Sequence, residues 1–207
     1  MEIKTLPLGP LGTNCYILHT TKHALIVDPG GNPEKVIELM EKYKLIPKAI
    51  LLTHAHFDHI GAVQELREKY QLGVYLHANE RDWLQDASLN GSLHFIGEQI
   101  TTNEPDHFFK EGEMEIAGIS FQILHTPGHS PGSVSFVFPK ESIVVSGDVL
   151  FRQGIGRTDL SGGDIGMLER SIKNKLYALD DSYTVYPGHG PETTIKYEKQ
   201  YNAFFPA

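Results

Sequence analysis

The sequence predicts an α+β fold in which mixed β-sheets are flanked by helices. Two observations lead to this fold class. Strand-like runs and amphipathic helical segments alternate along part of the chain, which is typical of parallel strands. Other strand-like runs follow one another closely, as the arms of a hairpin do, so an all-parallel sheet is not expected.

The expected strands are short runs rich in β-branched or aromatic residues. Each run has Gly, Pro, Asp or His at its last residue or next to it, and the first three of these residue types commonly terminate strands. The runs span residues 14–20, 24–30, 49–54, 73–78, 119–126, 133–138, 142–148 and 183–190.

Helices are expected where apolar residues recur at helical spacing. Residues 32–45 show this period, with Asn32 as N-cap and Pro33 as the first helical residue. The same period predicts helices over 59–72 and 164–179, each with one face packed on a sheet. The remaining predictions are a short helix around 79–87, a last helix from about 194 to 204, and a long irregular excursion over 88–107 of the kind that can cover a site.

The composition is that of a globular protein. No linker interrupts the 207 residues, so we expect a single domain over 1–207. No segment approaches the ~18 consecutive apolar residues that a membrane helix requires. The formal charge of −8 comes without a basic cluster, which argues against a nucleic-acid partner. We expect a monomer or small homo-oligomer that binds neither membranes nor nucleic acids.

The N-terminus and the cysteine content bear on the compartment. The chain begins without a basic segment followed by an apolar one, which is the pattern of a secretion signal. Its single cysteine, Cys15, has no partner for an intrachain disulfide and lies in an apolar strand-like run. We expect Cys15 to be a small buried core residue rather than a reactive thiol, and the protein to be cytoplasmic.

A dense group of metal-ligand side chains follows the expected strand at 49–54. The stretch "THAHFDHIG" contains His54, His56, Asp58 and His59. The period of a strand points His54 and His56 to the same side, and the chain then turns into a helix, so side chains from both arms of the turn can converge. Imidazoles and carboxylates suit zinc, iron or manganese, and the lack of cysteine argues against a thiolate-bound structural zinc. The sequence therefore predicts a metal site with open positions, and a histidine-rich turn without metal is the alternative.

Three polar residues at other strand ends share this character. His129 and His189 stand beside glycines, which allow a loop to aim an imidazole inward, and Asp148 ends a buried-looking run. A buried carboxylate without a counter-charge is costly, and a metal ion removes that cost. Each residue alone can be a hydrogen-bonded turn residue, but together they strengthen the metal interpretation.

Five motifs in a fixed order make the set recognisable: "THAHFDHIGA", "HTPGHSPGS", "SGDVLF", "GIGRTDL" and "YPGHG". They resemble the metallo-β-lactamase fold superfamily, and within it the glyoxalase II-like (hydroxyacylglutathione hydrolase-like) branch. The resemblance implies an αββα sandwich, two mixed β-sheets face to face with helices outside, and a dinuclear metal site at one edge. It implies a single domain without the added C-terminal substrate-binding domain that glutathione-binding enzymes of this branch carry.

The resemblance also implies a role for each site residue. The ligands of the first metal are matched by His54, His56 and His129. The ligands of the second metal are matched by Asp58, His59 and His189, and the bridging carboxylate by Asp148. The cofactors implied are two divalent metal ions, with zinc favoured over iron or manganese.

The implied reaction is hydrolysis of a small-molecule thioester such as S-lactoylglutathione, or of a related thiol-derived compound. Two divalent ions that share a carboxylate also share a water molecule, and its pKa falls toward ~7, so hydroxide can attack near neutral pH. One metal stabilises the oxyanion, and Asp58 or Asp148 orients the hydroxide and takes up its proton. Thiolate leaves readily, so the reaction needs little general-acid help.

Several alternatives stay open in the sequence. The turn at Asp28–Gly31 resembles one that supports the site loops in this family, and a simple turn is equally consistent. Arg157 falls where this branch places a basic residue near the carboxylates of a thiol substrate, and a surface ion pair is equally consistent. The "GRTD" run also resembles persulfide dioxygenases, which use a single iron and are the main rival. A lactonase and a non-catalytic metal-binding protein are further alternatives.

Overall fold

Two six-stranded β-sheets, each with parallel and antiparallel neighbours, form the frame of the protein. The computed structural model describes all residues, 1–207. The chain groups into two compact units: unit 1 is Met1–Phe109 with Glu115–Ile119, and unit 2 is Lys110–Met114 with Ser120–Ala207. The α+β class with two mixed sheets is thereby confirmed, and the single domain expected over 1–207 stays a prediction.

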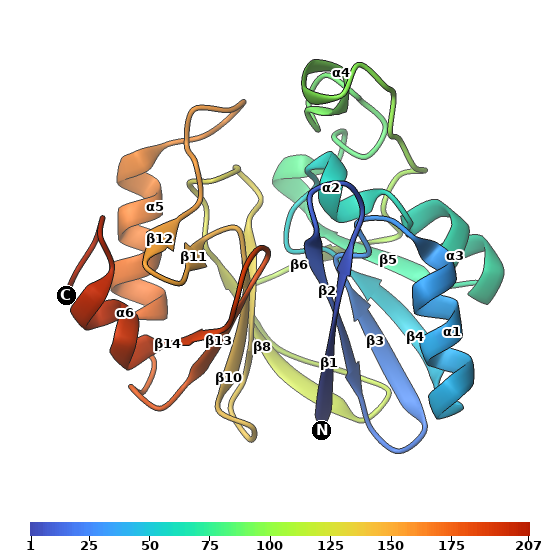
Figure 1. The fold of residues 1–207 in the computed structure, drawn as a ribbon, viewed down its shortest axis with the longest axis horizontal. Coiled ribbons are helices and arrows are strands. Elements are labelled where there is room, and N and C mark those ends of the chain that lie inside the picture. The colour runs from blue at the N-terminus through green and yellow to red at the C-terminus, as the bar shows by residue number, and fades with distance from the viewer. The chain divides into compact units, whose positions relative to one another are not determined.

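The sheet of unit 1 has the strand order β1-β2-β3-β4-β5-β6 (Figure 1). Neighbours are antiparallel from β1 to β3 and parallel from β3 to β6. The strands are β1 (Glu2–Leu8), β2 (Thr13–His19), β3 (His23–Val27), β4 (Ile46–Leu51), β5 (Gly73–His77) and β6 (His107–Phe109). The helices are α1 (Pro33–Tyr43), α2 (Phe57–Ile60), α3 (Val63–Tyr70), a 3-10 turn at Ala78–Glu80, and α4 (Ser92–Phe95).

Helices α1 and α3 lie along the parallel part of this sheet (Figure 1). The core beneath them joins Ile26, Ile50 and Val74 of the strands to Val36 of α1 and Leu66 of α3, all of them fully buried. Apolar area removed from water stabilises the fold by about 25 cal/mol per Å². The predicted amphipathic character of both helices is confirmed, because their apolar faces cover the sheet.

The main sheet of unit 2 has the order β14-β13-β10-β9-β8-β7. Its strands are β7 (Gly112–Ile116), β8 (Ile119–His125), β9 (Val134–Phe138), β10 (Ile143–Gly147), β13 (Thr184–Pro187) and β14 (Thr193–Thr194). A small hairpin of β11 (Leu150–Phe151) and β12 (Gly154–Ile155) follows β10. The helices are α5 (Ile165–Ser171), which continues as a π-helical turn at Ile172–Leu176, and α6 (Ile195–Tyr201).

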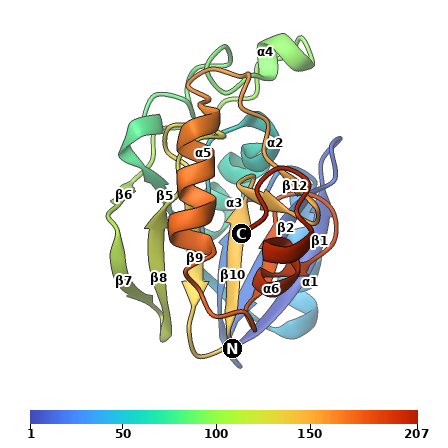
Figure 2. The same cartoon turned by 90° about the vertical axis from the view of Figure 1, so that its left-hand side faces the viewer.

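Figure 2 shows α5 and α6 in front of this second sheet. Val144 and Val185 of the sheet share one buried cluster with Leu168 of α5, Ile172 of the π-helical turn and Ile195 of α6. Leu168 and Ile172 belong to the apolar stripe expected over 164–179. The predicted packing of that helix on a sheet is therefore confirmed.

The helix predicted over 59–72 is two helices in the structure. The break falls at Gly61 and Ala62, where the backbone N–H of Ala62 donates to the carbonyl of Pro29 at 2.9 Å. A Cβ added at Gly61 would lie 2.5 Å from the carbonyl oxygen of Gly30, so the two backbones approach as closely as glycine allows. Helical periodicity does not reveal this long-range contact. The prediction of one continuous helix over 59–72 was therefore wrong at Gly61 and Ala62.

The prediction of a short helix around 79–87 was also wrong. Only Ala78–Glu80 form a 3-10 turn, and the turns that follow use hydrogen bonds between residues three apart, such as Trp83 N to the Glu80 carbonyl at 3.0 Å. The excursion over 88–107 is irregular as predicted, apart from the four-residue helix α4 and the start of β6. Strands β1, β6, β7, β11, β12 and β14 were not predicted.

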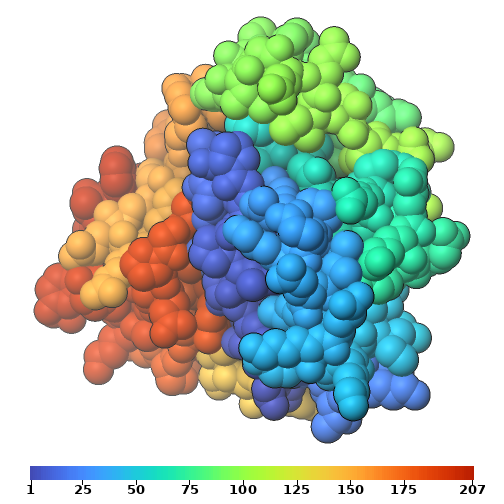
Figure 3. Space-filling model, turned by 45° about the vertical axis from the view of Figure 1, so that its right-hand side comes forward, coloured from blue at the N-terminus to red at the C-terminus, as the bar shows by residue number.

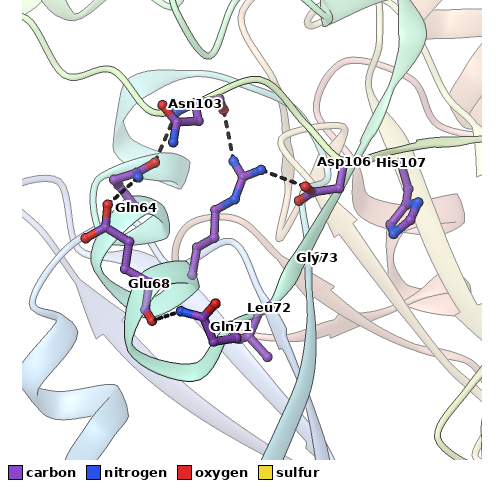
Figure 4. Close-up of a pocket in the computed structure, with 9 residues that line it drawn as sticks. Gln64, Glu68, Gln71, Leu72, Gly73, Asn103, Asp106 and His107 are labelled. Carbon is purple, nitrogen blue, oxygen red and sulfur yellow. Dashed lines mark hydrogen bonds and ion pairs between the residues drawn. The ribbon is translucent and has the colours of Figure 1, made fainter.

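The excursion forms the light-green top of unit 1 in Figure 3. Its return is fastened to α3 by Arg67, which donates to the carbonyls of Asn103 and Glu104 at 3.3 and 2.9 Å and to Asp106 Oδ1 at 2.8 Å. The Gln64 Oε1 atom accepts from Asn103 N at 3.0 Å. An open groove of about 630 Å³ is lined by Gln64, Arg67, Asn103 and Asp106, among others (Figure 4). The hydrogen bonds among these residues clamp the excursion to α3. None of the helices has the length and apolar character needed to cross a membrane.

We predict that Arg67→Ala lowers the free energy of unfolding by about 1–2 kcal/mol, because two backbone carbonyls and one carboxylate lose a charged donor. Urea unfolding of the purified protein measures this change. The matched control is Lys173→Ala, which removes only an exposed ion pair with Glu169 and should cost less than about 0.5 kcal/mol. Equal losses in the two variants would contradict the clamp.

Candidate metal centre

Unit 1 gathers the four predicted ligands of the first motif in one buried turn. The chain leaves β4 at Leu51 and enters α2 at Phe57, and the turn between them is packed into the interior. The ring centroid of His54 lies 4.8 Å from that of His56 and 4.1 Å from that of His59. The Nε2 atom of His59 lies 3.5 Å from Asp58 Oδ2. The convergence expected from the strand-to-helix turn is therefore present.

Asp28 supports this turn from the end of the neighbouring strand. Its Oδ1 accepts from Thr53 N at 2.8 Å, its Oδ2 accepts from Thr53 Oγ1 at 2.6 Å, and the same Oδ2 lies 3.0 Å from His59 Nδ1. The side chain is buried, with 1% of its surface exposed. Strands β3 and β4 are parallel neighbours, so their carboxyl ends meet at the same edge of the sheet. Asp28 therefore holds the histidine turn instead of only forming a turn of its own.

The hydrogen bonds around Asp28 and Thr53 decide which ring nitrogen of His54 and of His59 carries the proton. The carboxylate of Asp28 is an acceptor, so the His59 Nδ1 carries the proton and presents Nε2. The hydroxyl proton of Thr53 is used on Asp28, so the His54 Nδ1 at 3.1 Å from Thr53 Oγ1 is the donor in that contact. Both imidazoles then offer the Nε2 lone pair, which is the form that binds a metal.

Asp58 is held by residues that the sequence did not point to. Its Oδ2 accepts a hydrogen bond of 2.7 Å from the hydroxyl of Thr13, a buried residue at the start of β2. A Cβ added at Gly30 would lie 1.8 Å from the carbonyl oxygen of Asp58, so only glycine fits there. The glycines after Asp28 gave a sequence signal for this close approach, but nothing marked Thr13.

Unit 2 gathers the other three predicted ligands. Asp148 and His189 follow the parallel neighbours β10 and β13, and His129 lies in the loop after β8. Asp148 Oδ2 lies 3.7 Å from His129 Nε2 and 3.5 Å from His189 Nε2. One carboxylate oxygen thus faces two imidazole nitrogens, as expected of a group that shares a metal ligand shell with both.

The main chain at Arg157 orients His129. The carbonyl oxygen of Arg157 lies 2.8 Å from His129 Nδ1 and accepts a hydrogen bond from its N–H. The other ring nitrogen, Nε2, is then the one on the Asp148 side. A Cβ at Gly156 would lie 1.8 Å from the Asp148 carbonyl oxygen and 3.1 Å from the His129 Cβ. Glycine is therefore required where this loop passes the two ligands.

The side chain of Arg157 forms an exposed ion pair. It donates from Nε and Nη2 to the two carboxylate oxygens of Asp159, both at 2.7 Å. These hydrogen bonds lower the pKa of Asp159 to about 2. Half of the Arg157 side chain is exposed, so the ion pair contributes little to stability.

Cys15 is fully buried as predicted, and burial raises the pKa of its thiol.

Both sets of side chains have the donor chemistry of a divalent metal site. They consist of imidazole nitrogens and carboxylate oxygens without thiolate, which suits zinc, iron or manganese. In each set at least one histidine has its Nδ1 bonded to an oxygen acceptor, as metal-binding histidines nearly always do. The residues present therefore fit a bound divalent metal.

Comparison with known proteins assigns the family. Residues 8–189 match the metallo-beta-lactamase superfamily. The chain belongs to this superfamily. Proteins of the superfamily bind divalent metals, and the histidine and aspartate groups of both units agree with that property.

Two curated relatives span almost the whole chain. The probable metallo-hydrolase YqgX of Bacillus subtilis is 48% identical over 205 residues, which cover 99% of this chain and 97% of the relative. The hydroxyacylglutathione hydrolase GloC of Haemophilus influenzae is 39% identical over 208 residues, which cover 99% of this chain and 98% of the relative.

Solved structures confirm the metallo-β-lactamase fold. The crystal structure of the BLEG-1 B3 metallo-β-lactamase has a TM-score of 0.97 and 50% identity, with full coverage of both chains. The crystal structure of TTHA1623 in a di-iron-bound form has a TM-score of 0.89 and 44% identity, and it covers 98% of this chain and 100% of that one. The fold class predicted from the sequence is therefore confirmed.

We predict that Asp28→Ala lowers the free energy of unfolding of the metal-free protein by about 2–4 kcal/mol, because it leaves the buried donors of Thr53 and His59 without their acceptor. Asp28→Asn is the matched variant. Asparagine tolerates the left-handed backbone of this position, φ 49°, and its Oδ1 still accepts from Thr53 N, so the loss should be smaller. Urea unfolding of both variants provides the measurement, and no difference between Asp28→Ala and the wild type would refute the supporting role.

Proposed function

We propose that this protein, a metal-dependent hydrolase of the metallo-β-lactamase superfamily, hydrolyses small-molecule thioesters of the hydroxyacylglutathione type. The observation that carries the proposal is the pair of histidine–aspartate sets, each with at least one imidazole oriented through Nδ1 by an oxygen acceptor. The likeness to a hydroxyacylglutathione hydrolase over 99% of the chain supports the substrate class. A fold alone would not, because one fold hosts many reactions.

The ligand assignment is part of this proposal. In this assignment His54, His56 and His129 would hold a first metal, Asp58, His59 and His189 would hold a second, and Asp148 would be a ligand of both. The position of Asp148 Oδ2 between the imidazoles of His129 and His189 supports the bridging role. The di-iron form of a 44% identical protein supports two metals per chain. We propose zinc, with iron or manganese as the alternatives that metal analysis distinguishes.

The chain's own residues then divide the work of hydrolysis. Bound divalent ions supply hydroxide near neutral pH and polarise the acyl oxygen. Asp58 and Asp148 are the candidate proton acceptors, and the hydroxyl of Thr13 fixes the Oδ2 of Asp58 by a hydrogen bond of 2.7 Å that favours its charged form. The support of Asp28 fixes His54 and His59, so the ligands need little reorganisation during the reaction.

We predict that Asp148→Ala loses most of its bound metal and lowers thioester hydrolysis by at least about 100-fold, because the proposed bridging ligand is gone. Elemental analysis of the purified protein and a spectrophotometric S-lactoylglutathione assay measure the two effects. The control is Asp180→Ala, which removes an exposed turn carboxylate that accepts from Ser182 and should leave both quantities unchanged. Full metal content and activity in Asp148→Ala would overturn the assignment.

The substrate panel for the same preparation separates the rival reactions. It comprises S-lactoylglutathione, an uncharged thioester, a lactone, a β-lactam and glutathione persulfide. Hydrolysis of the thioesters with about two metals per chain is the expected result. Oxygen consumption with the persulfide, one iron per chain and intact thioesters would replace the hydrolase by a persulfide dioxygenase. Preferential opening of the β-lactam would place the chain with the 50% identical lactamase.

Arg157 is our candidate for the substrate carboxylates, since its guanidinium is about half exposed and its main chain is fixed by His129. We predict that Arg157→Ala raises KM for S-lactoylglutathione by about 3- to 10-fold with little change in kcat, as expected for loss of uniform binding. Steady-state kinetics provides the measurement, and KM for an uncharged thioester should not move. An unchanged KM for the glutathione thioester would leave Arg157 as a surface ion-pair residue.

A further inference from the structure

A turn outside the seven proposed ligands packs two buried side chains against the histidine turn. The 3-10 turn at Ala78–Glu80 follows β5 and leads into Trp83. The side chain of Glu80 is fully buried, and Trp83 exposes 6% of its surface. Neither residue belongs to a metal-binding motif of the sequence, and both lie in unit 1 with the histidines.

Glu80 contacts the peptide unit that links two proposed ligands. The backbone N–H of Ala55 donates to Glu80 Oε2 at 2.7 Å, and Ala55 stands between His54 and His56. A hydrogen bond to an ionised carboxylate is about twice as strong as one between neutral groups. Because the bond is buried, it restrains the orientation of the backbone from which both imidazoles project.

Trp83 restrains the second of these imidazoles from the side. The ring centroid of Trp83 lies 5.5 Å from that of His56, with 41° between the ring planes. The main chain of Trp83 is fixed by the same turn, since its backbone N–H donates to the Glu80 carbonyl at 3.0 Å. One short segment thus fixes both the backbone before His56 and the space beside its ring.

A purely structural filler would not need this carboxylate. Burying a charged group is costly, and a neutral amide oxygen can also accept from a backbone N–H such as that of Ala55. The protein contains a second fully buried glutamate for comparison, Glu198 of unit 2, which accepts from Thr193 Oγ1, Gln153 N and Asn202 Nδ2. Those donors tie the C-terminal helix to the β11–β12 hairpin, whereas the donor at Glu80 is the amide between His54 and His56.

We propose that Glu80 is a positioning residue for metal binding, which sets the geometry of His54 and His56 through the Ala55 amide, with Trp83 as the wall that limits rotation of His56. This inference rests on the proposed function, because it takes His54 and His56 to be metal ligands. It assigns Glu80 no contact with metal or substrate.

The test uses the full-length, metal-free protein titrated with Zn²⁺ in the presence of a competing chelator. Trp83 is the single tryptophan of the chain, so its fluorescence is a local reporter beside His56. The two variants are Glu80→Gln, which keeps an oxygen acceptor but not its charge, and Glu80→Asp, which withdraws the carboxylate by one methylene. Glu198→Gln is the matched control for loss of a buried carboxylate. Circular dichroism establishes that each protein is folded.

The expected result is a graded loss of Zn²⁺ affinity. Glu80→Gln should bind Zn²⁺ about 3- to 10-fold more weakly than wild type and Glu80→Asp about 10- to 100-fold more weakly, which is the usual range for residues that support metal ligands. In both, saturating Zn²⁺ should still change the emission of Trp83. Glu198→Gln should keep the wild-type affinity within twofold, even where its urea stability falls.

Two outcomes overturn the inference, and a third concerns the proposed function instead. A Zn²⁺ affinity of Glu80→Gln within twofold of wild type would show that the Ala55 contact does not position the ligands, whether or not Glu80→Asp folds. A loss in Glu198→Gln equal to that of the Glu80 variants would show a general effect of stability. Wild type and His56→Ala with the same Zn²⁺ affinity and no emission change would refute the proposed metal site itself.

Discussion

The buried carboxylate of Asp28 is the constraint on which the histidine turn depends. It accepts from both the backbone and the side chain of Thr53 and lies against Nδ1 of His59, while the Thr53 hydroxyl in turn accepts from His54. One acceptor therefore decides the tautomer of two imidazoles. Without it, each ring would be able to present either nitrogen, and a divalent ion would have to select and immobilise the productive form itself, which lowers its affinity.

In both units, parallel strands bring the polar side chains of each set together. In unit 1 the parallel neighbours β3 and β4 end in Asp28 and in the segment that carries His54. In unit 2 the parallel neighbours β10 and β13 end in Asp148 and His189, and the Gly188 amide donates to the Gly147 carbonyl at 2.8 Å beyond the last paired residues. Parallel strands bring their carboxyl ends to one edge, so polar residues distant in the sequence meet there without long connecting loops.

The sequence was sufficient for the fold class and for the residues of the two sets, since strands, helices and ligand-type side chains each leave a local pattern. It was not sufficient for the groups that hold those side chains. Thr13 and Glu80 accept or donate hydrogen bonds that join them to residues more than twenty positions away, and neither bond imposes a periodicity or a motif. The break in the helix at Gly61 has the same origin, because its cause is the carbonyl of Gly30.

At position 157 the main chain and the side chain have different contacts. The contact with His129 comes from the main-chain carbonyl, which any residue supplies, and the approach of the loop depends on Gly156. The side chain at 157 is about half exposed and forms an ion pair with Asp159, two residues on. The orientation of His129 thus depends on the main chain of Arg157, whereas the proposed substrate contact depends on its side chain. If Arg157 binds the substrate as proposed, a substitution there alters which charged groups the protein can bind, while His129 keeps its tautomer and its position. This separation agrees with the general rule that one fold hosts many reactions.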